Sequence, residues 1–421
     1  MSEPFPEAAP AVGGRDLRTI LAIQALRALL YGFGSVLIGA SLAKAGYSDA
    51  KVGLVFTAML AGFAVTSVAV GTRGDRIGRR RLYGALFLVM AGAGTVFALT
   101  RWLPGLIIAA LTGTISVEAN ESGPITSLEQ AMIPQATETA LQRNRAFARY
   151  NAVAYLAGSV GALAAGGPDF FRRFFPAVPA SQRFLLAYPV IGLACAFLAT
   201  RLSPRMESGE ELTAERKFPL VRSKRRVAGL AGLFAIDSFG GGFVVNSFIV
   251  FWFQRKFGAS TETLGLVFFV AGLLQSGSSI AAGRLANRIG LLNTMVFTHL
   301  PSNVLLILVP FMPNLRLAIA MLLARFAISQ MDVPARQAYV VSVVEPSERT
   351  AAASYTNTAR YVVRPAGPAL GGYLMQTISR SAPFVTAGAL KIVYDLTLLA
   401  TFRRVRESEP SGPTEAAKTP R

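Results

Sequence analysis

The fold is decided by the stretch Gly71-Thr72-Arg73-Gly74-Asp75-Arg76-Ile77-Gly78-Arg79-Arg80-Arg81. It holds five arginines and one aspartate in eleven residues, and long apolar runs flank it on both sides. A shorter version, Gly-Arg-Leu-Ala-Asn-Arg-Ile-Gly, recurs at residues 283–290. A charged, glycine-containing segment that appears twice between apolar runs indicates two related halves of one membrane protein.

The composition supports this interpretation. Of the 421 residues, 52% are hydrophobic and 15% are charged, whereas a soluble domain has about 25% charged residues. The apolar runs are about 20 residues long, which is the length a helix needs to cross a bilayer core. We therefore expect an all-α integral membrane protein. The net charge of +19 is explained by cytoplasmic loops rich in Lys and Arg, so no nucleic-acid partner is expected.

The apolar runs predict twelve transmembrane helices. Between a tail at residues 1–18 and a tail at 403–421, the expected spans are 19–42, 52–71, 82–100, 103–123, 146–166, 184–201, 228–253, 263–283, 293–312, 316–334, 351–376 and 383–402.

The distribution of positive charge predicts the orientation. If the N-terminus is cytoplasmic, the cytoplasmic segments hold more than twice as many Lys and Arg residues as the outer loops, which is the usual bias. We expect a multi-pass protein of the cell membrane with both termini in the cytoplasm. The longest predicted loop, 202–227, is cytoplasmic and carries a basic run that suits anionic lipid head groups.

The sequence also repeats internally. Five positions of the first half recur in the second at an offset of 206 residues, and the two charged segments are offset by 212. This duplication predicts halves at 19–201 and 228–402 with a solute site between them. The matched positions are Arg143, Asn151, Tyr155, Gly161 and Gly166 with Arg349, Asn357, Tyr361, Gly367 and Gly372.

Twelve spans, the six-plus-six repeat and a Gly-x-x-x-Asp-Arg-x-Gly-Arg-Arg segment between spans 2 and 3 resemble the major facilitator superfamily of secondary transporters. The resemblance implies two pseudo-symmetric six-helix halves, rocking-switch alternating access and a monomer. It also implies a conformational latch at the charged segment. The latch residues are Gly71, Asp75, Arg76, Gly78, Arg79 and Arg80.

Each part of this segment has a physical interpretation. Gly71 and Gly78 allow a tight reversal and a close backbone approach, and the arginines suit lipid phosphates or the carbonyls of helix C-termini. The resemblance implies that Asp75 meets the cytoplasmic start of span 11, near Ser347 or Thr350. The alternative is that Asp75 only neutralises the neighbouring arginines.

Charges inside spans cost roughly 2.5–3.5 kcal/mol each near the bilayer centre on insertion scales. The resemblance places spans 1, 4, 7 and 10 around a central cavity, and each of them carries a charge, so we expect a polar translocation site. The acids suit proton uptake and release, the arginines suit an anionic group, and Glu118 is expected opposite Arg325. The alternative is a set of fixed salt bridges. The residues are Arg27, Glu118, Glu121, Asp237 and Arg325.

Three further features concern the second half. Gly240-Gly241-Gly242 follows Asp237, where a helix could break. In span 11, Arg360 and Arg364 either lie in a helix-packing stripe or contact an anion. In span 12, Lys391 and Asp395 are spaced to neutralise each other. The single histidine, His299, is expected to pack or to form hydrogen bonds.

The expected function is secondary transport of a small organic solute, with proton-coupled export favoured. Uptake of an anionic metabolite held by Arg27 and Arg325, and a sensor that moves no solute, are the alternatives. The sequence has no phosphate-binding loop, Cys/His metal cluster or catalytic triad pattern, so neither an enzyme nor a cofactor is expected, and a proton gradient would drive transport. Drug–proton antiporters of the superfamily usually carry an arginine in span 4 and Gly-Pro-x-x-Gly-Gly in span 5. Here span 4 carries Glu118, and that glycine pattern stands in span 11 at residues 367–372.

Overall fold

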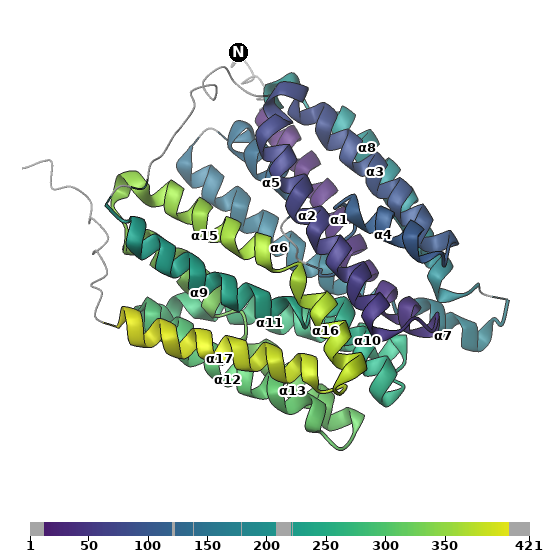
Figure 1. Ribbon diagram of the computed structural model, residues 1–421. Coiled ribbons are helices and arrows are strands. Elements are labelled where there is room, and N and C mark those ends of the chain that lie inside the picture. Colours follow the sequence, from purple (N-terminus) through teal and green to yellow (C-terminus); the bar gives the residue numbers. More distant parts are fainter. Residues whose placement is uncertain are drawn as a thin grey trace, which may run out of the picture.

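The computed structural model describes residues 12–119, 123–137, 139–177, 179–207, 220 and 222–403, and these residues form helices and short connections without a β-strand. Figure 1 shows the helices as two bundles that lean against each other. The first bundle contains α1 (Val12–Lys44), α2 (Asp49–Ile77), α3 (Arg79–Leu99), α4 (Leu103–Leu111), α5 (Pro124–Met132), α6 (Ala140–Ala164), α7 (Gly167–Phe174) and α8 (Ala187–Thr200).

The second bundle follows the predicted linker, of which residues 208–219 and 221 lie outside the described residues. It contains α9 (Lys224–Gly242), α10 (Asn246–Phe257), α11 (Thr261–Ile289), α12 (Leu291–Leu308), α13 (Leu315–Ile328), α14 (Asp332–Ser342), α15 (Arg349–Val363), α16 (Ala366–Thr377) and α17 (Ala382–Phe402).

The helices confirm the prediction of a twelve-helix membrane fold. Within the described part of the chain, nine helical segments are long and apolar enough to cross a membrane. The other three spans are the fourth, which is broken into α4 and α5, the fifth, which is the polar helix α6, and the eleventh, which is broken into α15 and α16. We call the face where α1 begins and α17 ends the terminal face, and the opposite face the distal face.

The charged stretch from Gly71 to Arg81 is helical up to Ile77, so the prediction that the second span ends at residue 71 is wrong. The helix ends only at Gly78, whose φ of +95° favours glycine. Its repeat mate Gly290 has a φ of +86° and ends α11 in the same way. The predicted role of Gly71 in a close backbone approach is wrong, because a Cβ there would meet nothing within 4 Å.

The fourth span does not form the continuous helix expected over 103–123. The chain leaves α4 after Leu111 and turns at Gly113, whose φ is +66°. The turn packs so tightly on α2 that a Cβ at Gly62 would lie 2.7 Å from the Gly113 nitrogen. The helix resumes at Pro124, whose fixed φ suits a first helical position. Non-helical backbone at this depth is tolerated because it is buried in protein or faces the cavity described below.

The two bundles meet through pairs of glycines near the distal face. In Figure 1, α2 of the first bundle runs beside α16 of the second. A Cβ at Gly372 would lie 2.3 Å from the Asp49 carbonyl oxygen, and one at Gly53 would lie 2.3 Å from the Pro368 oxygen. Helices α6 and α11 meet in a related way, since a Cβ at Gly166 would lie 2.8 Å from the Glu262 Cα. Because these sites lack a Cβ, the backbones approach closely and the distal face is closed.

We predict that Gly372→Ala opens the distal face, because overpacking a tight contact costs about 1–3 kcal/mol. Spin labels at Arg183→Cys and Pro313→Cys, in a Cys195→Ala background that removes the only cysteine, should report longer distances by pulsed electron resonance. Gly92→Ala is the matched control, because a Cβ at Gly92 would meet nothing within 4 Å. Equal distance distributions for both variants would contradict this role of Gly372.

Candidate functional site

A cavity of about 900 Å³ lies between the two bundles. Helices of both bundles contribute to its wall, and most of the lining side chains are polar or charged. The predicted site residues that can be placed all line it, whereas Glu121 lies outside the described residues. The placed residues are Arg27, Glu118, Asp237, Arg325, Arg360 and Arg364.

The distal face is closed over this cavity by ion pairs as well as by glycine contacts. Arg173 of α7 and Glu262 of α11 join the bundles at 2.5 Å, and Arg255 of α10 lies 3.6 Å from Asp49 of α2. The Lys44 Nζ donates to the Asp169 Oδ2 at 2.7 Å and to the Thr261 hydroxyl of the other bundle at 3.3 Å. Three ion pairs between the bundles are seen in the described residues. Two lie at this face, and the third joins Glu118 to Arg364 inside the cavity.

In the first bundle, Arg27 forms a fully buried ion pair with Glu129. The Arg27 Nη2 lies 2.6 Å from the Glu129 Oε2, and the Glu129 side chain is 0% exposed. Tyr83 donates its hydroxyl to the other carboxylate oxygen at 2.7 Å, and Tyr150 donates to Oε2. Arg27 also donates to Gln24 and to Tyr150. The sequence did not identify Glu129, because the fourth span was ended at residue 123, six positions before it.

In the second bundle, Asp237 is the centre of a larger buried cluster. The Lys391 Nζ donates to the Asp237 Oδ1 at 2.6 Å, and the Arg336 guanidinium donates to Oδ2 at 3.2 Å. The same guanidinium nitrogen contacts Asp332 at 3.0 Å. Sequence reasoning missed Arg336, because the tenth span was ended at residue 334 and α14 extends it to Ser342. Asp332 lies inside the predicted span but was not singled out there.

The cluster continues from Asp237 to His299 and Asn303 of α12 and to Asp395 of α17. The His299 Nε2 lies 3.7 Å from the Asp237 Oδ1, and its Nδ1 lies 2.9 Å from the Asp395 Oδ1. The Asn303 amide donates to the other Asp395 oxygen at 3.0 Å. The expected pairing of Lys391 with Asp395 is wrong, because Lys391 turns to Asp237 while Asp395 turns to α12. We call Asp237, His299, Asn303, Asp332, Arg336, Lys391 and Asp395 the C-half network.

Glu118 crosses the cavity, but its partner differs from the predicted one. Its Oε1 lies 2.7 Å from an Arg364 nitrogen on the other bundle, rather than beside Arg325. The break in the fourth span explains the change, because Glu118 stands on non-helical backbone instead of one turn along a regular helix. The pair is partly exposed, with 26% of the Glu118 side chain accessible.

Two other arginines face the cavity without a close carboxylate. Within the described part of the chain, neither Arg325 nor Arg360 forms an ion pair, and the Nε of each lacks a hydrogen-bond partner. Longer-range attraction links Arg325 to Glu118, Asp237 and Asp332. These two guanidiniums are therefore the cationic groups best placed to receive an anion from the cavity.

The two bundles hold related ion pairs of opposite polarity. Arg27 and Glu129 join the first span to the fourth, and Asp237 and Arg336 join the seventh span to the tenth. The offsets between these mates, 210 and 207 residues, fall within the range of the sequence repeat. The two halves therefore place an ion pair at related positions, with the acidic and basic partners exchanged.

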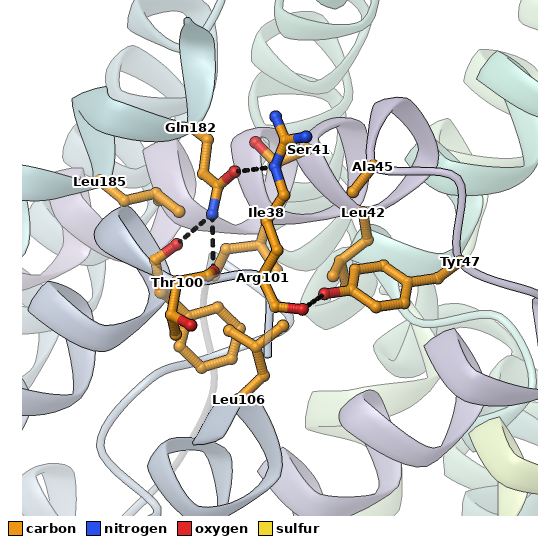
Figure 2. A pocket seen from close by; sticks show the side chains of 11 residues that line it. Ile38, Ser41, Leu42, Ala45, Tyr47, Thr100, Arg101, Leu106, Gln182 and Leu185 are labelled. Carbon is orange, nitrogen blue, oxygen red and sulfur yellow. Dashed lines mark hydrogen bonds between the residues drawn. The ribbon is translucent and has the colours of Figure 1, made fainter. Parts of the chain in front are cut away.

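A second, much smaller hollow lies at the distal end of the first bundle (Figure 2). Its volume is about 10 Å³, so it cannot hold an organic solute. Gln182 points into it and donates to the carbonyls of Phe97 and Thr100 at 3.0 and 2.9 Å, while Arg101 donates to the Gln182 oxygen. These contacts satisfy the C-terminal carbonyls of α3, and the hollow is structural.

The sequence matches the family model described as Major Facilitator Superfamily over residues 20–365 and again over 238–421. The chain belongs to the major facilitator superfamily.

Relatives and solved structures agree with this assignment. An uncharacterized membrane protein of Saccharomyces cerevisiae, YJR124C, is 28% identical over 92% of this chain and 94% of its own. The solved nucleoside transporter NupG has a TM-score of 0.73 at 11% identity, covering 92% of this chain and 99% of its own. A bacterial homologue of the human lysosomal transporter Spinster, in an inward-facing occupied conformation, has a TM-score of 0.71 at 14% identity, covering 94% and 98%.

The chain is therefore a multi-pass membrane protein with the fold of this superfamily, whose members carry small solutes. Two of the predicted latch arginines contact helix C-termini, as expected: Arg80 donates to the Thr200 carbonyl of α8 at 3.2 Å, and Arg79 donates to the Ala131 carbonyl of α5 at 3.4 Å. Arg76 is exposed. The side chain of Asp75 lies outside the described residues, so its latch role stays a prediction.

We predict that Glu129→Leu strongly destabilises the protein, because it leaves the Arg27 charge buried and unpaired. Removing one partner of a buried pair costs about 3–5 kcal/mol, and thermal unfolding followed by intrinsic fluorescence should show a lower Tm. The double variant Arg27→Met with Glu129→Leu is the control and should recover most of the loss. A single variant as stable as the double would refute this account of the pair.

We predict that the distal contacts of Asp169 resist acid. Partial burial raises the pKa of Asp169, but hydrogen bonds from Lys44, Ser181 and Thr261 outweigh this effect and lower the pKa to about 2. Since the pKa is depressed, the stabilisation is present above the unfolded value of about 3.9 and is lost as the pH falls through about 2.

The distances between the distal spin labels should therefore be the same at about pH 8 and pH 5. Asp169→Asn should lengthen them at both pH values. Opening of the unmodified protein on going from pH 8 to 5 would show that other groups hold the distal face closed.

Proposed function

We propose that this protein carries a small organic anion across the membrane together with protons. The observation that supports this most is the pair of guanidiniums, Arg325 and Arg360, that face the cavity without an ion pair in the described residues. A carboxylate or phosphate fits the fork of a guanidinium through two parallel hydrogen bonds. Arg364, paired with Glu118 across the cavity, could join them after exchanging partners.

The size and surface of the cavity support a small polar solute. Its volume of about 900 Å³ falls within the range of about 300–1,000 Å³ that small-molecule sites occupy. Two of the similar solved structures are named a nucleoside transporter and a D-xylose–proton symporter, so the fold accommodates polar cargo.

Export of an amphipathic compound, which the sequence favoured, receives less support. Such a compound needs an extended apolar wall, and the aromatic side chains of the lining are few and separated by polar groups. Phe147, Phe268 and Phe326 are the phenylalanines of the described wall.

Electrostatics favours transport of the anion and the proton in the same direction. An anion bound beside the carboxylates of the C-half network adds negative charge there, and a proton offsets it. Binding of the two is therefore mutually supportive rather than competitive. We propose that the terminal face is cytoplasmic, as the distribution of Lys and Arg predicts, and that a monomer in the cell membrane uses the inward proton gradient for uptake.

The test uses purified protein and a panel of succinate, citrate and 3-phosphoglycerate. We predict that at least one of them raises the Tm of the unmodified protein, because a solute that binds only the folded state stabilises it. Arg325→Gln and Arg360→Gln should each weaken this binding roughly 10–100-fold, since a hydrogen bond to a charged group contributes about 1.5–3 kcal/mol.

Arg316→Gln is the matched control, because Arg316 is an exposed arginine on the same helix as Arg325. It should leave the binding unchanged. Proteoliposomes loaded with a pH-sensitive dye then measure coupling and direction: acidification of the interior on adding the anion outside supports proton-coupled uptake, and its absence with a bound anion supports a sensor. If no anion stabilises the protein but an amphipathic cation does, the proposal is wrong.

A further inference from the structure

We propose that the transported proton binds the imidazole of His299, with Asp395 as its fixed partner. The inference rests on the proposed proton-coupled transport and names the residue that carries the proton. This site lies between α12 and α17, the ninth and twelfth spans, outside the four spans whose charges the sequence singled out.

The geometry indicates which ring nitrogen takes the proton. The Nδ1 of His299 lies 2.9 Å from the Asp395 Oδ1, so the neutral ring carries its hydrogen there and donates it. This tautomer is assigned from the hydrogen bond. The lone pair of Nε2 then faces the Asp237 Oδ1 at 3.7 Å, an unfavourable approach of two acceptors. A proton on Nε2 converts this approach into an attraction.

Asp395 is buried and held by hydrogen bonds, so that it serves as the hydrogen-bond partner of His299 and does not take a proton from the cavity itself. Its side chain is 1% exposed, and its other oxygen accepts from the Asn303 amide at 3.0 Å. His299 itself lines the cavity, whereas Asp395 does not. Water in the cavity can therefore deliver a proton to the imidazole, and the carboxylate behind it orients the ring and stabilises the imidazolium.

The charges of the C-half network do not balance when His299 is neutral. Its carboxylates outnumber its permanent cations by three to two, which leaves one negative charge, and the imidazolium removes it. An uncompensated buried charge destabilises the folded protein. One added proton removes this charge, so the network favours binding a single proton. The carboxylates are Asp237, Asp332 and Asp395, and the cations are Arg336 and Lys391.

Arg325 and Arg360 connect this proton site to the solute site. They lie outside the hydrogen-bonded network, but both are attracted to Asp237 at longer range, and Arg360 is also repelled by Arg336. In the empty cavity their positive charge compensates the network. When a bound anion neutralises Arg325 and Arg360, the negative charge of the C-half network is no longer compensated. A proton on the Nε2 of His299 then compensates it. Anion binding therefore promotes proton uptake.

The groups that surround His299 come from several packed elements. Helix α9 presents Asp237, α17 presents Lys391 and Asp395, and the Tyr394 ring stacks edge-on against the imidazole at 5.9 Å between centroids. Behind Asp237, helix α14 adds Arg336, which pairs with Asp237 and Asp332, and α15 adds Arg360, which interacts with Asp237 at longer range. The step needs no other reactant: the proton leaves a cavity water species and binds the Nε2 lone pair, and it returns to water on the other side after the bundles rock.

The single histidine makes a direct experiment possible. Full-length protein with ¹⁵N-labelled histidine and no polyhistidine tag gives one pair of imidazole nitrogen signals. We predict that adding the stabilising anion of the panel at a fixed pH of about 7.5 converts this signal toward the imidazolium form. An imidazole that keeps one protonation state between about pH 5 and 9 and ignores the anion would overturn the proposal, without any variant.

Variants separate this proposal from the proposed function. His299→Gln and Asp395→Asn should lose the proton uptake that a pH dye records when the anion is added in weak buffer. They should keep an anion-dependent rise in Tm, but a smaller one than in the unmodified protein, because the proton no longer supports anion binding. Ser302→Ala is the control, because Ser302 is a buried, uncharged residue on the same helix, and it should keep both responses. If the unmodified protein shows no anion response, the proposed function fails. If His299→Gln keeps the full proton uptake, only the assignment to His299 fails.

Discussion

A charge inside the bilayer core must be paired or must face water, and each half of this protein meets that constraint with a buried ion pair between its first and fourth spans. Arg27 with Glu129 and Asp237 with Arg336 occupy related positions with opposite signs. Breaking such a pair leaves an uncompensated buried charge, so the pairs fix how these spans lie in each half. The spans around the cavity are held at this depth by these contacts.

The two pairs differ in the groups that surround them, and this difference suits the two halves to different roles. Tyrosine hydroxyls complete the coordination of Glu129, and that pair is balanced. The pair at Asp237 is joined to further acids and to a histidine, and it retains one unmatched charge. A balanced site is suited to rigidity, whereas an unbalanced site beside water is suited to titration. Arg325 and Arg360 line the same cavity as the unbalanced site.

The helix breaks make this arrangement possible. The broken part of the fourth span meets the break of the seventh, where Ser247 donates its backbone N–H to the Val117 carbonyl at 3.1 Å and its hydroxyl to Ser35 of the first span at 2.8 Å. The glycines that follow Asp237 end α9 at Gly242, which confirms the predicted break. Breaks of this kind leave backbone N–H and C=O groups without helical partners, and groups of the other half then form hydrogen bonds with them. These bonds link the two halves beside the cavity.

The sequence by itself determined the twelve spans, the six-plus-six repeat, the turn at Gly78 and the superfamily, because each depends on local periodicity, on a positive φ or on a repeated motif. It also identified Arg27, Glu118, Asp237 and Arg325 as charges facing the interior. Only the tertiary structure decided which charge meets which. Glu129 pairs with Arg27, although the break in the fourth span placed it beyond the predicted end of that span. Glu118 pairs with Arg364. Lys391 pairs with Asp237 and not with its sequence neighbour Asp395. Sequence spacing fixes which face of a helix a side chain occupies, but a partner on another helix depends on where helices break and how closely their backbones approach.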